Sequence, residues 1–202
     1  MLFSLHISST KKEEKMQKIF AGKIDGREIK DGSVVLVKVP SKKLIETNVQ
    51  ILKHYVRDKK YSAVYVTVNK PFSELIEKFK EEKIDTDKIF VIDAVTPRKF
   101  INGNSRAENA VFIGSPRELT NISITTTSKI KELKTAKVLI FDSVSTLLVY
   151  NEFDSVKDFV RFISNKMKEL NVTFAMICIK ESVDEKFISQ LSSFVDEIIE
   201  IE

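Results

Sequence analysis

The chain has 202 residues, of which 43% are hydrophobic and 31% are charged. These are values of a globular protein, so disordered, collagen-like and disulfide-framework classes are excluded. The single cysteine permits no internal disulfide, which favours a reducing compartment, and no apolar stretch approaches the length that spans a bilayer. We therefore expect a cytoplasmic protein with one domain over residues 1–202, in which residues 1–31 are an N-terminal extension with a helix near residues 8–22.

Charge is distributed unevenly along the chain. Residues 1–60 hold 14 Lys and Arg against 7 Asp and Glu, whereas residues 181–202 hold 1 against 7. The simplest interpretation is that two solvated faces attract one another in the fold or between subunits, and a basic site for a polyanion is the alternative. Lys outnumbers Arg by 27 to 6 and there are three Gln, a balance typical of hyperthermophile proteins, so we expect a thermophilic source.

Short apolar runs alternate with amphipathic stretches, which is the pattern of a parallel sheet covered by helices on both faces. We therefore predict an α/β fold, a three-layer sandwich with a mostly parallel sheet. The predicted strands are 34–39, 63–68, 89–95, 110–113, 137–142, 173–179 and 197–201. Apolar residues at helical spacing predict helices over 45–56, 72–79 and 153–170.

Turn and cap residues mark the ends of several elements. Asp25-Gly26 and Asp31-Gly32 predict turns. Ser115–Glu118 and Ser182–Glu185 have the form of a capping box, which predicts that a helix begins at each. The first of these helices would run through Asn121–Ser128, where the β-branched residues Thr and Ile are unfavourable for a helix.

The loop after the first strand is the first place to look for a ligand site, because open parallel sheets bind ligands beyond the carboxyl ends of their strands. This loop begins Pro40-Ser41-Lys42-Lys43 and contains no glycine. A P-loop, G-x-x-x-x-G-K-[ST], needs its glycines so that backbone amides can close around phosphates. Lys42 or Lys43 could still reach a phosphate from a helix N-terminus, although lysines at such positions are more often simply solvated.

The strand over 137–142 ends in Asp142, which is followed by Ser143. An apolar strand that ends in aspartate has the form of a Walker B motif, whose carboxylate holds Mg²⁺ through water. A phosphatase of the D-x-D-x-T type would need a second carboxylate at the position of Val144. Asp142 is therefore the candidate metal ligand, and only if a Mg-nucleotide binds. Without a cation, it should be solvated at the sheet edge or hydrogen-bonded to neighbours, such as the amides that follow its own strand.

The segment Lys137–Leu148 resembles the Walker B strand and trailing Asp-Ser of the RecA superfamily, and within it of the archaeal KaiC-like ATPase domains. Val195–Glu200 is similar to the closing D-x-I-I-x-I strand of that family, and Gly32–Val95 fits in order. The resemblance implies an archaeal source and a RecA-like sheet, related to P-loop NTPases, with strand order 5-1-4-3-2.

Two departures from the family bear on catalysis. Pro40–Glu46 replaces the P-loop, and Asn69 and Lys70 stand where the family has its catalytic glutamate. Neither residue can act as a general base in the way that a carboxylate does. The nucleotide-binding candidates are Ser41, Lys42, Lys43, Asp142 and Ser143. We expect no cofactor beyond weak binding of ATP and Mg²⁺, and no catalytic residue is assigned.

Three functions remain open at this point. The first is a catalytically degenerate ATPase-fold protein, a pseudo-ATPase that acts as a regulatory or interaction module with a protein partner or a second copy. The second is an atypical nucleotide-binding ATPase that uses Lys42 or Lys43 with Asp142. The third is a weak nucleic-acid-binding module, suggested by the basic first 60 residues, whose aromatic residues are too scattered for an obvious stacking platform.

Overall fold

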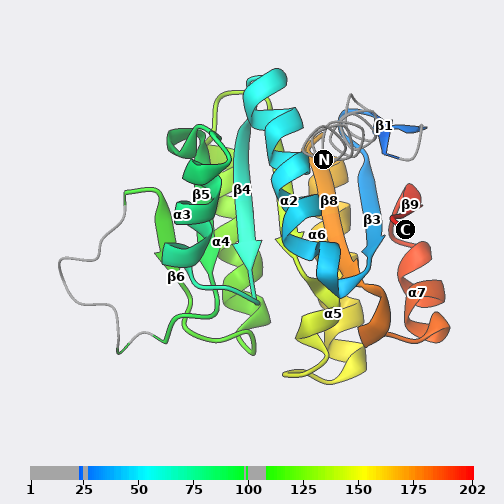
Figure 1. The fold of residues 1–202 in the computed structure, drawn as a ribbon. Helices are drawn as coiled ribbons and strands as arrows, with labels where there is room; N and C mark the ends of the chain where they lie inside the picture. Colours follow the sequence, from blue (N-terminus) through cyan, green and yellow to red (C-terminus); the bar gives the residue numbers. More distant parts are fainter. Residues whose placement is uncertain (1–22, 25–26, 98, 100–107) are drawn as a thin grey trace, which may run out of the picture.

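The computed structural model describes residues 23–24, 27–97, 99 and 108–202 (Figure 1). The helix predicted near residues 8–22 and the turn predicted at Asp25-Gly26 lie outside this part of the chain. Two short strands at its start, β1 (Lys23–Ile24) and β2 (Arg27–Glu28), pair with each other antiparallel.

The main sheet of the described chain has seven strands, all parallel, in the order β6-β5-β4-β7-β8-β3-β9. The strands are β3 (Val34–Val39), β4 (Ser62–Thr67), β5 (Ile89–Asp93), β6 (Ala110–Phe112), β7 (Lys137–Asp142), β8 (Thr173–Ile179) and β9 (Glu197–Glu200). Each was predicted from the sequence to within two residues at its ends. Without β5 and β6 at one edge, the order from the opposite edge is β9-β3-β8-β7-β4. When these five strands are numbered 1 to 5 along the chain, this is the predicted order 5-1-4-3-2.

Helices cover both faces of this sheet, so the predicted three layers are confirmed (Figure 1). One face carries α2 (Leu44–Leu52), its π-helical continuation η2 (Lys53–Asp58) and α3 (Phe72–Glu81). The other carries α4 (Leu119–Glu132), α5 (Val144–Leu147), α6 (Phe153–Glu169) and α7 (Glu185–Ser192). Short 3₁₀ turns complete the described chain: η1 (Ser41–Lys43), η3 (Thr86–Lys88) and η5 (Lys180–Ser182).

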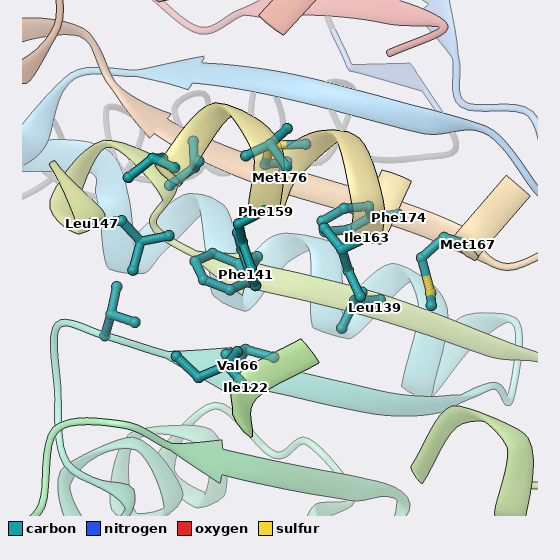
Figure 2. Packing of buried hydrophobic residues seen from close by; sticks show 14 of the residues in the cluster. Val66, Ile122, Leu139, Phe141, Leu147, Phe159, Ile163, Met167, Phe174 and Met176 are labelled. Carbon is teal, nitrogen blue, oxygen red and sulfur yellow. The ribbon is translucent and has the colours of Figure 1, made fainter. Parts of the chain in front are cut away.

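The core has two halves because successive strand residues point to opposite faces. In β3, Val34 and Leu36 pack toward α4 and α6, whereas Val35 and Val37 pack toward α2 and α3. Figure 2 shows the first half, in which the rings of Phe141 and Phe159 lie with their centroids 5.4 Å apart. Burial on both faces explains why the strands are almost continuously apolar rather than alternating.

Both helix starts predicted from capping boxes are wrong in position. The Ser115 hydroxyl accepts a hydrogen bond from the amide of Arg117, two residues on, so a turn forms there and α4 begins at Leu119. The start of α7 is capped by Asp184, whose carboxylate accepts from the amide of Phe187. A serine followed three residues later by glutamate also suits a turn, which explains the error at Ser115, whereas Ser182 ends the 3₁₀ turn η5.

Two weaker local signals are confirmed. Residues 121–128 are helical within α4 despite their Thr and Ile, because Ile122 and Ile130 are buried in the core and tertiary packing outweighs propensity. The turn at Asp31-Gly32 forms with φ +82° at the glycine, where an added Cβ would lie 2.2 Å from the Oδ1 atom of Asn171.

Candidate functional site

The candidate residues all follow the carboxyl ends of strands, at the bottom of the sheet in Figure 1. Asn69 and Lys70 follow β4, and Asp142 and Ser143 end or follow β7, the adjacent strand. Ser41–Lys43 follows β3, which is separated from β7 by β8. The fold therefore places Asn69 and Lys70 beside Asp142 and Ser143, whereas Ser41–Lys43 is separated from them by the strand β8.

Asp142 is 1% exposed, and both of its carboxylate oxygens accept hydrogen bonds from side chains. The Tyr65 hydroxyl donates to Oδ2 at 2.7 Å, and the Asn69 Nδ2 atom donates to Oδ1 at 2.8 Å. The expectation that this carboxylate, without a cation, is hydrogen-bonded to neighbours is confirmed, but the partners are side chains of β4 and the loop that follows it rather than amides after its own strand. These residues lie next to Asp142 because β4 pairs with β7 in parallel.

The Tyr65 hydroxyl connects Asp142 to a helix on one side of the sheet. It accepts a 2.9 Å hydrogen bond from the Nδ2 atom of Asn48, a fully buried residue of α2. The Oδ1 atom of Asn48 has no hydrogen-bond partner among the described residues. The amide, the phenol and the carboxylate thus form a chain of buried donors and acceptors that joins α2, β4 and β7.

Asn69 continues the same network to the other side of the sheet. Its Oδ1 atom accepts from the Thr146 hydroxyl at 2.7 Å, and that hydroxyl lies 2.9 Å from the Ser143 hydroxyl. Ser143 is also 3.1 Å from the hydroxyl of Ser145, which accepts from the amide of Ile179 at 2.9 Å. The predicted site residue Ser143 is therefore fully buried within a network that ties β7 to β8.

The electrostatics of this cluster follow from its burial. Burial raises the pKa of Asp142 above its ordinary value, while the hydrogen bonds from Tyr65 and Asn69 and the nearby charge of Lys70 oppose that rise. Burial, together with the charge of Asp142, raises the pKa of Tyr65 well above its ordinary value. Tyr65 therefore acts as a neutral donor to the carboxylate.

Three backbone amides of the loop after β3 donate hydrogen bonds within the protein. The Ser41 amide donates to the Oε2 atom of Glu181 at 3.0 Å, and the Lys43 amide donates to the carbonyl of Pro40 at 2.8 Å. The Leu44 amide donates to the carbonyl of Ser41. Lys43 Nζ donates to the backbone carbonyl of Glu202, and Lys42 is exposed.

Two acidic residues near the C-terminus pair with Lys38, one of the lysines of the basic first 60 residues. Lys38 Nζ lies 3.7 Å from a carboxylate oxygen of Glu185 and 3.4 Å from one of Glu200. For these pairs the predicted attraction between the two ends of the chain occurs within the fold.

Asp93 is a buried carboxylate at the end of β5 that sequence reasoning missed. It accepts from the amides of Phe72, Val95 and Thr96 and from the Thr96 hydroxyl, at 2.7 to 2.8 Å. An Asp followed three residues later by Thr at a strand end was the available signal. Within the described residues, no group of three or more His, Cys, Asp or Glu is placed to hold a metal ion.

The comparisons with known proteins extend these observations to the whole fold. A family model described as a family of unknown function (DUF7504) matches residues 32–201. No curated protein matches the sequence. A solved KaiC-like protein, PH0186, from the hyperthermophilic archaeon Pyrococcus horikoshii OT3 is similar, with a TM-score of 0.62 and 12% identity over 87% of this chain and 74% of that one.

The structural likeness supports the predicted fold class, an α/β fold of the RecA and KaiC-like kind with a parallel sheet. Of the helices in the described part of the chain, none is long and apolar enough to span a membrane.

Proposed function

The chain belongs to the DUF7504 family, a family of unknown function. We propose that it is a catalytically degenerate RecA-like protein, an interaction module that does not hydrolyse nucleotides. The burial of Asp142 carries this proposal. A Walker B carboxylate must present an oxygen toward the water shell of Mg²⁺. Here the side chain is 1% exposed and both oxygens accept from Tyr65 and Asn69, so the residues present do not fit a bound Mg-nucleotide.

The loop after β3 supports the same proposal. Anion sites at helix starts depend on backbone amides that point at the ligand. The amides of Ser41, Lys43 and Leu44 instead donate to groups of the protein itself. The carboxylate of Glu181 is bound to the Ser41 amide, so a phosphate would have to displace a negative group that is already there.

The residues at the position of the family's catalytic glutamate, Asn69 and Lys70, also favour a protein without hydrolytic activity. The Asn69 side chain donates to Asp142 and accepts from Thr146, so both ends of its amide are used. Lys70 pairs with Glu74 at the start of α3. Neither group offers a carboxylate to orient and deprotonate water.

The atypical ATPase that uses Lys42 or Lys43 with Asp142 is the alternative, and it requires two rearrangements. Lys43 would have to leave the carbonyl of Glu202, and Asp142 would have to leave Tyr65 and Asn69. The nucleic-acid-binding module stays a prediction that depends on the basic first 60 residues. The thermophilic and archaeal source and the cytoplasmic location also stay predictions.

Titration of the wild-type protein with ATP in the presence of Mg²⁺, followed by calorimetry and by phosphate release, tests the proposal. We expect no binding tighter than about millimolar and no release above the protein-free rate. Asp142→Asn and Lys42→Ala are the matched variants, one for each half of the alternative site. A micromolar dissociation constant for wild type, together with weaker ATP binding by either variant, would favour the atypical ATPase.

A further inference from the structure

The helices α4 and α6 lie on the side of the sheet opposite α2 and α3 (Figure 1), and the first part of α4 carries no charge. Ten consecutive residues, Leu119–Ser128, are uncharged in a chain of which 31% is charged. Ile124 is 62% exposed and Phe162 is 53% exposed. Both line a depression of about 630 Å³ between the two helices, with Phe159 at its inner wall. We call this surface the α4–α6 face.

The loop that leads into α6 adds to the α4–α6 face. Arg117 donates to the carbonyl of Tyr150 at 2.8 Å, and Asn151 donates to the carbonyl of Pro116 at 3.1 Å, so the loop is held beside the start of α4. Val149, in the same loop, is 73% exposed. Apart from Val111, these are the exposed large apolar side chains of the described chain. Ile124 and Phe162 lie together at one depression, which is typical of an interaction surface rather than of scattered surface residues, and Val149 lies in the loop that adjoins it.

The charges on α6 indicate which partner fits the α4–α6 face. Asp158 lies four residues before Phe162 and Lys166 lies four residues after it, so all three share one side of the helix. Their pairings within the chain are with near neighbours on the same helix, Arg161 at 3.1 Å and Glu169 at 2.7 Å. Such pairs are weak at an exposed position and can rearrange.

A two-fold axis through Phe162 makes this arrangement self-complementary. When two copies of α6 cross antiparallel at Phe162, Asp158 of each copy lies opposite Lys166 of the other, and the two Phe162 rings meet at the centre. Closed dimers use the same patch on both subunits in this way. A nucleic acid or an acidic partner would find no such match, because the charges on either side of Phe162 are of opposite sign.

We propose that the α4–α6 face is a homodimer interface in which α6 packs antiparallel on α6 of a second copy, centred on Phe162. This names a partner for the interaction module proposed above and rests on that role, but not on the state of the nucleotide site. The contact centres on one pair of helices, so we expect a small interface and a weak, concentration-dependent dimer.

Sedimentation velocity over a wide concentration series tests the proposal. We expect wild type to pass from monomer to dimer and Phe162→Glu to stay monomeric, with an unchanged thermal midpoint because the side chain is half exposed. Val111→Glu is the matched control, since Val111 is also an exposed apolar residue but lies on β6, and it should dimerise as wild type does. A wild type that remains monomeric throughout, or a Phe162→Glu variant that still dimerises, overturns the proposal.

Charge reversal tests the antiparallel register. Asp158→Lys alone and Lys166→Asp alone each place like charges opposite one another twice, so each variant should dimerise at least tenfold more weakly than wild type. Mixed together, the two variants bring opposite charges together at both positions, and native mass spectrometry should show their heterodimer. Absence of that heterodimer overturns the antiparallel arrangement. Nucleotide titration does not enter either experiment, so failure here is distinguishable from failure of the pseudo-ATPase proposal.

Discussion

The hydroxyl of Tyr65 donates a 2.7 Å hydrogen bond to the Oδ2 atom of Asp142, and both side chains are buried, at 0% and 1% exposure. The two residues meet because β4 and β7 are adjacent and in register, with Thr67 opposite Asp142. A phenol and the amide of Asn69 therefore satisfy the carboxylate inside the protein. In this arrangement Asp142 stabilises the carboxyl end of the central strands rather than binding a cation.

Removal of the Asp142 carboxylate should cost more than its conversion to an amide. Asp142→Ala leaves the Tyr65 hydroxyl and the Asn69 amide buried without an acceptor, and we expect a loss of about 2 to 4 kcal/mol in the free energy of unfolding. Asp142→Asn keeps one acceptor and removes a buried charge, so its loss should be about 1 to 2 kcal/mol. Urea denaturation of both variants measures the difference. Equal losses would contradict this role.

The stability difference between wild type and Asp142→Asn should depend on pH. Burial raises the pKa of Asp142 in the folded protein, so the unfolded chain ionises first as the pH rises above about 3.9. The stability that wild type gains from the raised pKa of Asp142 is therefore fully present below that pH and is lost as the pH rises through the pKa of the folded protein. When the two proteins are denatured side by side, the stability of wild type should fall relative to that of Asp142→Asn as the pH rises, and the difference should then become constant. A shift in the opposite direction would mean that the folded pKa is lowered.

The buried and exposed tyrosine–aspartate pairs of this protein offer a matched comparison. Tyr65→Phe leaves Asn48 Nδ2 and Asp142 Oδ2 without their shared partner, and we expect a loss of about 1 to 3 kcal/mol. Tyr61 makes a similar 2.8 Å hydrogen bond to Asp31 at the surface. Tyr61→Phe should therefore change stability by less than about 0.5 kcal/mol. Thermal or chemical denaturation of both variants decides whether burial makes the difference.

Asp93 is predicted to be as important to stability as Asp142. Its carboxylate accepts four hydrogen bonds, including one from the Phe72 amide at the start of α3, so Asp93→Ala should cost about 2 to 4 kcal/mol. Asp85 is the control, because at the surface it accepts a long 3.3 Å hydrogen bond from the Asp87 amide and lies 3.8 Å from Lys88 Nζ. Asp85→Ala should lie within about 0.5 kcal/mol of wild type. Similar losses for the two variants in urea denaturation would contradict the role given to Asp93.

The sheet could be predicted from the sequence because each strand is a short apolar run that is buried on both faces. The runs at 34–39, 137–142 and 173–179 coincide with strands to the residue. Helix starts were harder, since the same Ser-to-Glu spacing at Ser115 serves a turn in the folded chain. The apolar runs also predicted that the strands are parallel, but the order of the strands depends on contacts between distant segments, and only the family resemblance indicated that order.

The candidate site was predicted only in part. Asp142 was singled out by its Walker B form and Asn69 by the family resemblance, but neither indicated that the two side chains bond to each other. Tyr65 was missed because it lies inside an apolar strand, where an aromatic residue is most often core. Asn48 was missed for a similar reason, since a polar residue in the second turn of an amphipathic helix gives no sign that it points at a neighbouring strand.

The thermal midpoint in the presence of Mg-ATP tests the central claim most directly, because a ligand raises the midpoint only by binding the native state. Wild type and Asp142→Asn are heated with and without millimolar Mg-ATP. We predict that neither midpoint rises, since the carboxylate is satisfied by Tyr65 and Asn69 and the Ser41 amide by Glu181. A rise of several degrees for wild type that Asp142→Asn abolishes would contradict this and reveal a working nucleotide site.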